Sequence, residues 1–546
     1  MANPPFRDIH GHPELKTFLS ADDEAHRLDC WQILNLPVLL KMIDRIMLGN
    51  ILESQGSLSQ LNTVKGTIAQ AGLYSLEKAM VNGDLIHLLG SHVNLVEVAR
   101  LLKLKGYPGI IDYDLMQRIS FPQTSYFDIF IEDQNHLLKS MIINPGYKLM
   151  NKIEDYDSNK LNLILCIEGG HNLLTSATGN NLRNDVISNL RALKSSGHRY
   201  LFMGLTHVEC NPLCTQAYAI QFLHHKDFMP VGHGITQLGI DVITEALRRP
   251  NRILIDIKHM SLESRKKYYD ILRRDYRSQN IPILISHGGV TGVSWENKPV
   301  VCWKKSDECI KVRYFRPKGL MKTRFNPWSI NLYDEEIQII VESDGLIGLN
   351  LDERILGAKQ KRQGKRIEYF SPEEFNRHNF KKQLLRCIFA WEPFEILTDE
   401  DRNTREIETR LIEYLQNIIM DHTHIHDFDG MLAEIERLYN LLPAHIISEK
   451  GVKHLCNNIL HIIKIAGDEG WKHISIGSDF DGLINAVDFC KNATQYNNLA
   501  FELVRLLPIM AATISGFPPI TNIQQKVSDI MSGNAFSFLQ RYFRHD

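Results

Sequence analysis

Short apolar runs that stop at a polar residue recur along the chain and alternate with segments of helical period. A run of four to eight apolar residues that ends at a polar residue is typical of a buried parallel strand entering a loop. Eight strands are predicted, at 6–10, 66–76, 161–167, 200–207, 252–257, 282–286, 346–351 and 474–480. Predicted helices between them include 75–103, 131–142, 184–197, 235–251, 262–275 and 334–345. This alternation predicts an α/β fold, a (β/α)8 TIM-type barrel.

The connection between the seventh and eighth strands, residues 352–455, is oversized for such a barrel. Two segments in it, 405–420 and 429–443, carry apolar residues at helix spacing, and a structureless loop of this length is uncommon in a compact domain. We therefore expect a helical insertion that packs on the barrel or on another subunit, which would make a homodimer. Because the strand-end motifs run from residue 10 to about 481, residues 1–546 are expected to form a single barrel domain.

The composition of the chain limits the kinds of molecule that it is expected to bind. The chain is 44% apolar and 23% charged with a formal charge of −2, so there is no electrostatic basis for binding nucleic acid or an anionic membrane. No window approaches 18 uninterrupted apolar residues, so a membrane-spanning segment is not expected. The first motif begins by residue 10, so a targeting segment before it is not expected either. The nine cysteines are scattered without a CxxC pair, which favours reduced thiols. We expect a cytoplasmic protein with a small-molecule or peptide substrate.

Histidines and carboxylates stand at the ends of these predicted strands. They are His10, His12, Glu168, His207, His259, His287 and Asp479. In an α/β barrel the C-terminal ends of all strands open at one mouth, so residues far apart in the chain can converge there. Imidazole and carboxylate groups are the ligands of zinc-type hydrolytic sites. The pattern indicates a metal-dependent hydrolase.

The first two histidines are spaced to act together. His10 and His12 lie at i and i+2, which in a strand places both side chains on one face. Glu168 ends an apolar strand, where an unpaired carboxylate is costly to bury and a metal ion or a salt bridge must compensate it. Taken singly, His259 and His287 are as consistent with hydrogen-bonded core histidines as with ligands. Together, the five residues in strand-end register predict a metal site.

The motifs also resemble those of a known family. DIHGHP, IEGGHNL, GLTHVECN, IDIKHMS, ISHGG and GSDFDG, in this order, resemble the motifs of the membrane dipeptidase family (renal dipeptidase, peptidase M19) of the amidohydrolase superfamily. The resemblance extends over roughly residues 6–350 and 456–490. It implies a barrel that binds one or two zinc ions, with a binuclear site as the family pattern. It also implies hydrolysis of a small amide or peptide bond by a metal-bound hydroxide.

Residue roles follow from the resemblance. His10 and His12 would bind one zinc ion, Glu168 would bridge two, and His259 and His287 would bind the second. This assignment suits the chemistry, because two cations lower the pKa of a shared water and polarise a carbonyl.

The catalytic roles would fall on two further residues. His207 would hydrogen-bond the substrate and the developing oxyanion. Asp479 would orient the water, accept its proton and pass it to the leaving amine, a step for which an adjacent carboxylate is competent. Asp481 and Asp256 are rival carboxylates, interpreted as a supporting partner of the site and as a strand or helix contact.

The sequence departs from the family pattern at two important positions. His12 stands where the family usually has aspartate, which makes the site one charge more positive. Ile330, in SINLYDEEI, stands where the family carries an arginine for the substrate's carboxylate. Nearby cations that could replace it are Arg313, Arg316, Lys322 and Arg324, and we select Arg324 as a substrate-binding residue. The long 352–455 connection could also narrow the pocket and exclude long peptides.

Two alternatives to a dipeptidase stay open. One is an amidohydrolase that acts on a lactone, a cyclic amide or an N-acyl amino acid, which the missing arginine favours. The other is a non-catalytic metal-binding barrel. The latter would be marked by loss of metal ligands or of the terminal aspartate, and neither residue type is lost here.

Overall fold

The structure of the protein is a computed structural model. It describes residues 6–12, 83–89, 125–143, 145–175, 182–219, 228–305, 308–314, 316–358, 367–375, 449–480, 482, 484, 486–490 and 493–544. The predicted helices at 405–420 and 429–443, and most of the 352–455 insertion, lie outside these residues. Asp481, one of the rival carboxylates, lies outside them too.

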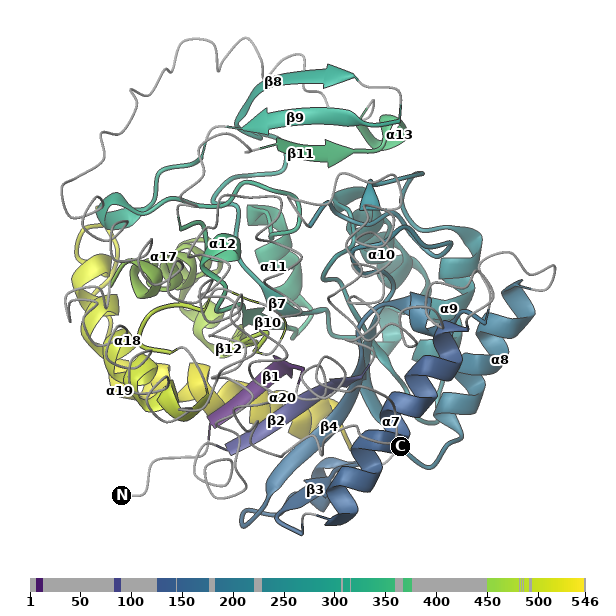
Figure 1. Ribbon diagram of the computed structural model, residues 1–546. Coiled ribbons are helices and arrows are strands. Elements are labelled where there is room, and N and C mark those ends of the chain that lie inside the picture. Colours follow the sequence, from purple (N-terminus) through teal and green to yellow (C-terminus); the bar gives the residue numbers. More distant parts are fainter. Residues whose placement is uncertain are drawn as a thin grey trace, which may run out of the picture.

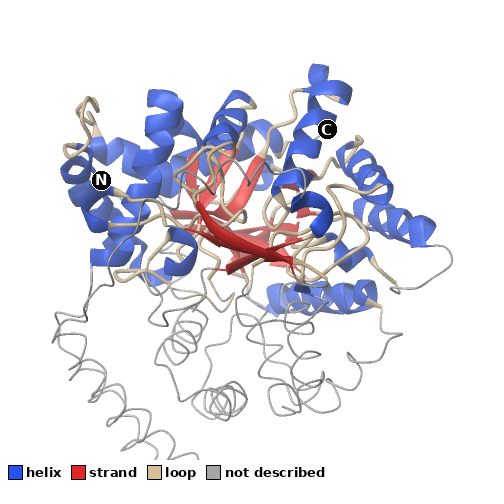
Figure 2. Ribbon diagram, turned by 90° about the horizontal axis from the view of Figure 1, so that it is seen from above, coloured by secondary structure: helices blue, strands red, loops and turns tan. Residues whose placement is uncertain are grey.

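Eight parallel strands form a closed ring at the centre of the molecule (Figures 1 and 2). In ring order they are β1 (Phe6–Gly11), β2 (Gly83–Leu89), β4 (Leu161–Ile167), β5 (Tyr200–Gly204), β6 (Leu254–Asp256), β7 (Leu284–Gly288), β10 (Leu346–Leu349) and β12 (Ile474–Ile476). Pairing of β12 with β1 and of β2 with β4 closes the ring. A short strand, β3 (Tyr147–Leu149), adds to the outside of β4. The predicted (β/α)8 barrel is confirmed.

Helices surround the ring of strands (Figure 2). They are α7 (Tyr126–Ile143), α8 (Leu182–Lys194), α9 (Gln237–Leu247), α10 (Leu262–Asp275), α11 (Asp334–Glu342), α12 (Glu353–Leu356), α13 (Pro372–Phe375), α17 (Glu449–Ala466), α18 (Tyr496–Ala511), α19 (Ile523–Ser528) and α20 (Asn534–Tyr542). β4, for example, is covered on both faces, and all seven of its residues are buried. This burial explains why the strands show as continuous apolar runs in the sequence.

The position of the second strand differs from the prediction. The sequence pattern predicts this strand at 66–76, which lies outside the described residues, and a helix at 75–103. The structure instead has β2 at Gly83–Leu89, inside that predicted helix. The helix assignment for this segment was wrong, because an apolar run as short as DLIHLL fits either period and the barrel uses it as a strand.

A second, antiparallel sheet was not predicted. It consists of β8 (Val300–Lys305), β9 (Ile310–Tyr314) and β11 (Ile367–Phe370), in the order β11-β9-β8. The segments after β7 and after β10 supply its strands, so it stands on the side of the barrel where the parallel strands end (Figure 1). A separate buried apolar cluster, which includes Tyr218, Trp328 and Ile330, underlies it.

The described part of the insertion is therefore mixed rather than only helical. Its first segment contributes β11 and the short helices α12 and α13, and its end overlaps α17, which begins at Glu449. Among the described residues, no helix has both the length and the apolar character needed to cross a membrane.

Candidate metal centre

All seven residues selected at predicted strand ends lie at the C-terminal end of the barrel. Their positions are His10 in β1, His12 just after it, Glu168 after β4, His207 after β5, His259 after β6, His287 in β7 and Asp479 after β12. Six of them are at most 6% exposed, and Asp479 has 16% of its side chain exposed. The structure thus brings together residues that are up to 469 positions apart in the chain.

Glu168 is the centre of the cluster. Its Oε1 atom lies 3.6 Å from His10 Nε2, 3.5 Å from His207 Nε2, 3.4 Å from His259 Nε2 and 3.6 Å from His287 Nε2. Four imidazole nitrogens from four different strand ends therefore face one carboxylate oxygen. Buried nitrogen and oxygen donors at these separations can surround a metal ion.

The second group of contacts joins β1 to the end of β12. His12 Nε2 lies 3.0 Å from Asp479 Oδ1, 3.2 Å from His10 Nε2 and 3.6 Å from Glu168 Oε2. His10 Nε2 also lies 3.6 Å from Asp479 Oδ1. The i and i+2 histidines thus point into the same space, as the strand period requires, and Asp479 closes the cluster on their side.

Burial controls the protonation of this cluster. Desolvation lowers the pKa of His10 to about 3 and holds the pKa values of His207, His259 and His287 well below the ordinary range. These imidazoles are therefore neutral at pH 7, so each has a nitrogen lone pair to offer. Burial also raises the pKa of Glu168 to about 7, although the charge of His12 opposes this shift.

The donor set fits a divalent metal ion. Glu168 Oε2 and His259 Nε2 are buried and have no hydrogen-bond partner among the described residues. A buried polar atom without a partner is costly, and a cation that accepts lone pairs from both oxygen and nitrogen would remove this cost. Imidazole together with carboxylate suits zinc and similar borderline-soft ions.

Asp479 differs from the other carboxylate. Burial raises its pKa, but hydrogen bonds and charge interactions with His10 and His12 outweigh burial, so the pKa lies below its ordinary value. Asp479 is therefore ionised at neutral pH, whereas burial makes Glu168 harder to ionise and raises its pKa to about 7. Different protonation of two neighbouring carboxyl groups is common at catalytic sites.

Two residues of the cluster and one neighbouring glycine have unusual backbone conformations. His259 and Asp479 have φ values of 65° and 62°, in the left-handed region that side chains other than glycine's rarely adopt. Gly169, directly after Glu168, has φ 91°, and a Cβ atom there would lie 2.4 Å from His171 Nδ1 and 3.1 Å from His207 Cβ. Strained backbone of this kind is concentrated at functional sites.

Two residues that lie at this cluster were not selected from the sequence. Asn350, after β10, donates from Nδ2 to Asp479 Oδ2 at 3.2 Å, and its Oδ1 accepts from the backbone N–H of Asp352 at 2.6 Å. Lys258 is only 2% exposed, and its Nζ has no hydrogen-bond partner among the described residues. Asn350 ends the LIGLN run and could have been found by the strand-end rule, whereas Lys258 gave no separate signal beside His259.

The predicted carboxylate-binding residue lies next to α17. Arg324 is partly buried, and its backbone N–H donates to His454 Nε2 on α17 at 3.3 Å. Its role at the substrate stays a prediction. Ile330 is 2% exposed in the apolar cluster beneath the antiparallel sheet. Arg354, which was not selected, interacts electrostatically with Asp479 while its Nε donates to both oxygens of Asp352 at 2.9 and 2.8 Å.

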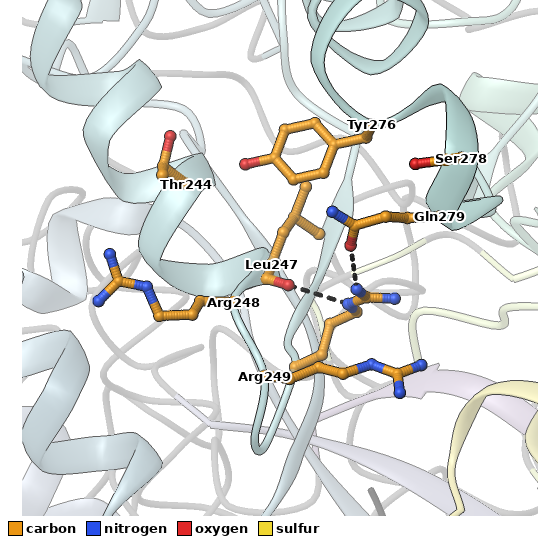
Figure 3. Close-up of a pocket in the computed structure, with 8 residues that line it drawn as sticks. Thr244, Leu247, Arg248, Arg249, Tyr276, Ser278 and Gln279 are labelled. Carbon is orange, nitrogen blue, oxygen red and sulfur yellow. Dashed lines mark hydrogen bonds between the residues drawn. The ribbon is translucent and has the colours of Figure 1, made fainter.

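Figure 3 shows a separate cleft in the structure. It has a volume of about 620 Å³ and is lined by Thr244, Leu247, Arg248, Arg249, Arg252, Tyr276, Ser278 and Gln279. These residues belong to the connections that lead into β6 and β7, at the N-terminal ends of the strands. In a barrel of this type, chemistry is located at the other end of the strands.

The family comparison matches one part of the chain. The family model of the membrane dipeptidases (peptidase family M19) matches residues 322–514, about a third of the sequence. The matched range includes Asn350 and Asp479, while the histidines of the cluster and Glu168 precede it. No curated protein matches the chain in sequence.

The solved structures that match the chain have low sequence identity to it. The probable dipeptidase PvdM from Pseudomonas aeruginosa is 17% identical, with 77% of this chain and 81% of that chain covered and a TM-score of 0.42. An amidohydrolase from the same organism is 12% identical, with 77% and 87% covered and a TM-score of 0.40. A metallopeptidase from Rhodobacter sphaeroides, liganded with a phosphinate mimic of the dipeptide L-Ala-D-Ala, is 13% identical, with 99% of each chain covered and a TM-score of 0.43. Likenesses at this level say nothing about what this chain binds or cleaves. Residues 322–514 of the chain are therefore similar to the membrane dipeptidases of peptidase family M19.

Proposed function

We propose that the protein is a metal-dependent hydrolase that cleaves a small amide or peptide bond, as a dipeptidase does. The observation that carries the proposal is the convergence of four neutral imidazole nitrogens on Glu168 Oε1, all within 3.6 Å. A hydrogen-bonded core histidine needs one partner, whereas four histidines around one carboxylate make a ligand set.

The proposed metal ligands are five of these residues. His10 and His12 would hold one ion, Glu168 would be shared, and His259 and His287 would complete the set for a second ion. Zinc is the proposed ion, one or two per chain. When bound, it would polarise a carbonyl group and lower the pKa of a water molecule towards neutrality.

Two residues would carry out the remaining chemistry. Asp479 would accept the proton of the attacking water and return it to the leaving amine. Its Oδ2 is held by the Asn350 amide, while Oδ1 faces the histidine pair of β1. Because the Oδ1 of Asn350 is already occupied by a backbone N–H, the amide group must direct its own N–H towards Asp479. His207, 3.5 Å from Glu168, would hydrogen-bond the substrate's carbonyl oxygen.

The identity of the group attached to the scissile bond is a separate question. The proposed residue for a free carboxylate is Arg324. Ile330 occupies the position of the family's arginine and is buried in an apolar cluster rather than placed as a cation. This observation favours the second candidate, an amidohydrolase for lactones, cyclic amides or N-acyl amino acids whose carboxylate is masked or absent.

Metal analysis tests the proposal directly. Protein purified without chelator is expected to contain zinc, to lose it to chelator and to regain it with hydrolytic activity. His259→Ala should reduce the zinc content. His461→Ala serves as a matched control, because that histidine lies on α17 and pairs with Asp334 at 2.7 Å. Less than about 0.3 equivalents of any transition metal, not restored by added zinc, would contradict the proposal.

A further inference from the structure

A buried aspartate below the metal centre connects two neighbouring strands. Asp256, the last residue of β6, is 4% exposed. Its Oδ1 accepts the backbone N–H groups of Lys258 and Ser286, both at 3.0 Å, and its Oδ2 accepts the hydroxyl of Ser286 at 2.5 Å. Three donors on one carboxylate fix its orientation, and these hydrogen bonds partly oppose burial, which raises the pKa of Asp256. From the sequence alone, Asp256 is expected only to make a strand or helix contact.

A second aspartate makes nearly the same arrangement between β1 and β12. The Oδ1 of Asp8 accepts the backbone N–H groups of His10 at 3.1 Å and Ser478 at 2.8 Å. Its Oδ2 accepts the hydroxyl groups of Ser478 and, at 2.6 Å, Tyr496. In both cases the serine directly precedes a residue of the metal centre.

The two serines differ in what else they contact. The Oγ atom of Ser286 lies 2.9 Å from Nδ1 of His287. The Oγ atom of Ser478 accepts the backbone N–H of Phe480 at 3.0 Å instead. Only the arrangement at β6 and β7 therefore reaches an imidazole, and the arrangement at β1 and β12 provides an internal control.

The hydrogen bonds of Ser286 determine which ring nitrogen of His287 carries the proton. A serine hydroxyl has one proton, and the Ser286 hydroxyl donates it to Asp256. The hydroxyl oxygen must then accept at its contact with His287, so the imidazole proton lies on Nδ1. This leaves the lone pair on Nε2, the nitrogen that lies 3.6 Å from Glu168 Oε1.

We propose that Asp256 acts through Ser286 as a positioning residue that sets the tautomer of His287 for metal binding. The inference rests on the proposed function for its purpose, but the tautomer itself does not depend on a bound metal. Outer partners of this kind orient metal-binding histidines and tune their affinity.

Two substitutions separate this role from simple support of the strands. In Asp256→Asn, the amide oxygen still has to accept the two backbone N–H groups, so the NH2 group faces the Ser286 hydroxyl. That hydroxyl must then accept from Asn and donate to His287 Nδ1, which moves the imidazole proton to Nε2 and blocks the nitrogen that faces Glu168. Ser286→Ala removes the connection without imposing the wrong tautomer.

The primary experiment is ¹⁵N NMR of metal-free protein labelled at histidine, with His287 assigned by comparison with His287→Gln. In the wild type, the two ring nitrogens of His287 should give the shifts of an Nδ1-protonated imidazole. Asp256→Asn should reverse this pattern, whereas Asp8→Asn and Ser478→Ala should leave it unchanged. An Nε2-protonated His287 in the wild type, or an unchanged pattern in Asp256→Asn, would overturn the proposal.

Zinc affinity, measured by competition with a chromophoric chelator, gives the second readout. We expect zinc binding to weaken by about 100-fold in Asp256→Asn and by about 10-fold in Ser286→Ala. A merely structural role predicts the reverse order, because Asn keeps the two backbone hydrogen bonds and Ala leaves a buried carboxylate oxygen without its donor. If Asp256→Asn does not fold, Ser286→Ala decides the matter: loss of the slowly exchanging Nδ1 proton signal of His287 supports the proposal, and its retention overturns it. If the wild type binds no zinc at all, the proposed function fails, while the NMR result on metal-free protein still decides the tautomer.

Discussion

Replacing Glu168 by glutamine should stabilise the metal-free protein at pH 8 and remove most of its response to zinc. Burial raises the pKa of this carboxyl from 4.5 to about 7 in the folded state. Between these two pH values the folded chain retains a proton that the unfolded chain has already released. The free energy of unfolding therefore falls as the pH rises through this interval, which is the sign required when the folded state binds more protons.

The size of the effect follows from the same shift. A pKa that moves from 4.5 to about 7 corresponds to about 3 kcal/mol, all of it present above pH 7 and absent below pH 4.5. Glutamine keeps the shape of the side chain but carries no charge. Glu168→Gln should thus gain up to about 3 kcal/mol over the wild type at pH 8 and almost nothing at pH 4.

Urea denaturation of chelator-treated protein, followed by circular dichroism at both pH values, measures this difference. Glu374→Gln is a matched control, because burial raises the pKa of Glu374 to about 7 too, and glutamine can retain the Oε1 contacts with Ser261 at 2.6 Å and Gly234 at 3.0 Å. Saturating zinc should stabilise the wild type and Glu374→Gln, by about 2.7 kcal/mol at 100 times the dissociation constant, but not Glu168→Gln. Equal stability of Glu168→Gln and the wild type at pH 8, or an undiminished zinc response, would refute the reasoning.

Two further predictions concern catalysis. Asp479→Asn should keep its fold and its zinc but lose on the order of 10² to 10⁴ in kcat, because a general acid–base group is removed; full activity would show that the role is wrongly assigned. Free dipeptides should be turned over poorly compared with N-acyl amino acids, lactones or cyclic amides on zinc-loaded enzyme, since a bidentate guanidinium is absent at Ile330. A kcat/KM for a simple dipeptide of about 10⁴ M⁻¹s⁻¹ or more would instead restore plain dipeptidase activity.

Much of the barrel could be predicted from sequence because its strands are buried on both faces. A strand such as Leu161–Ile167 shows as an uninterrupted apolar run, and its end is marked by the polar residue that enters the mouth. The same rule selected the seven histidines and carboxylates that the structure brings together, since the topology of a parallel barrel puts all such ends together. The barrel fold and the residues of the cluster could therefore both be predicted from the same pattern of apolar runs that end at polar residues.

The antiparallel sheet above the barrel was not accessible in this way. Its strands at Val300–Lys305 and Ile310–Tyr314 are short and carry lysines, and their third partner, Ile367–Phe370, comes from a different connection. Pairing between distant segments leaves no periodic signal in either one. The sheet and the apolar cluster beneath it explain why Ile330, read as a missing arginine, is a buried packing residue.

The backbone conformation at His259 could not be predicted from the position of this residue at a strand end. In an extended strand Lys258 and His259 would point to opposite faces, so the period cannot place both side chains in one site. Both are nevertheless buried, with 2% and 6% exposed. The left-handed φ of 65° at His259 breaks the alternation and turns the chain, and its Nε2 reaches Glu168 at 3.4 Å.

Backbone conformations of this kind depend on the surrounding contacts rather than on the local sequence. After His259, the hydroxyl of Ser261 donates to Glu374 and its backbone N–H donates to Thr215 O at 3.0 Å, while Ala217 N–H donates to His259 O at 2.7 Å. These partners lie on segments far apart in the chain, one of them in the insertion after β10. The sequence can therefore identify which histidine belongs to the centre, but the strained turn that delivers it is imposed by the folded molecule, where several contacts together offset the cost of the conformation. The described start of the insertion thus has a function that its composition does not suggest, because Glu374 helps to hold the loop of a proposed metal ligand.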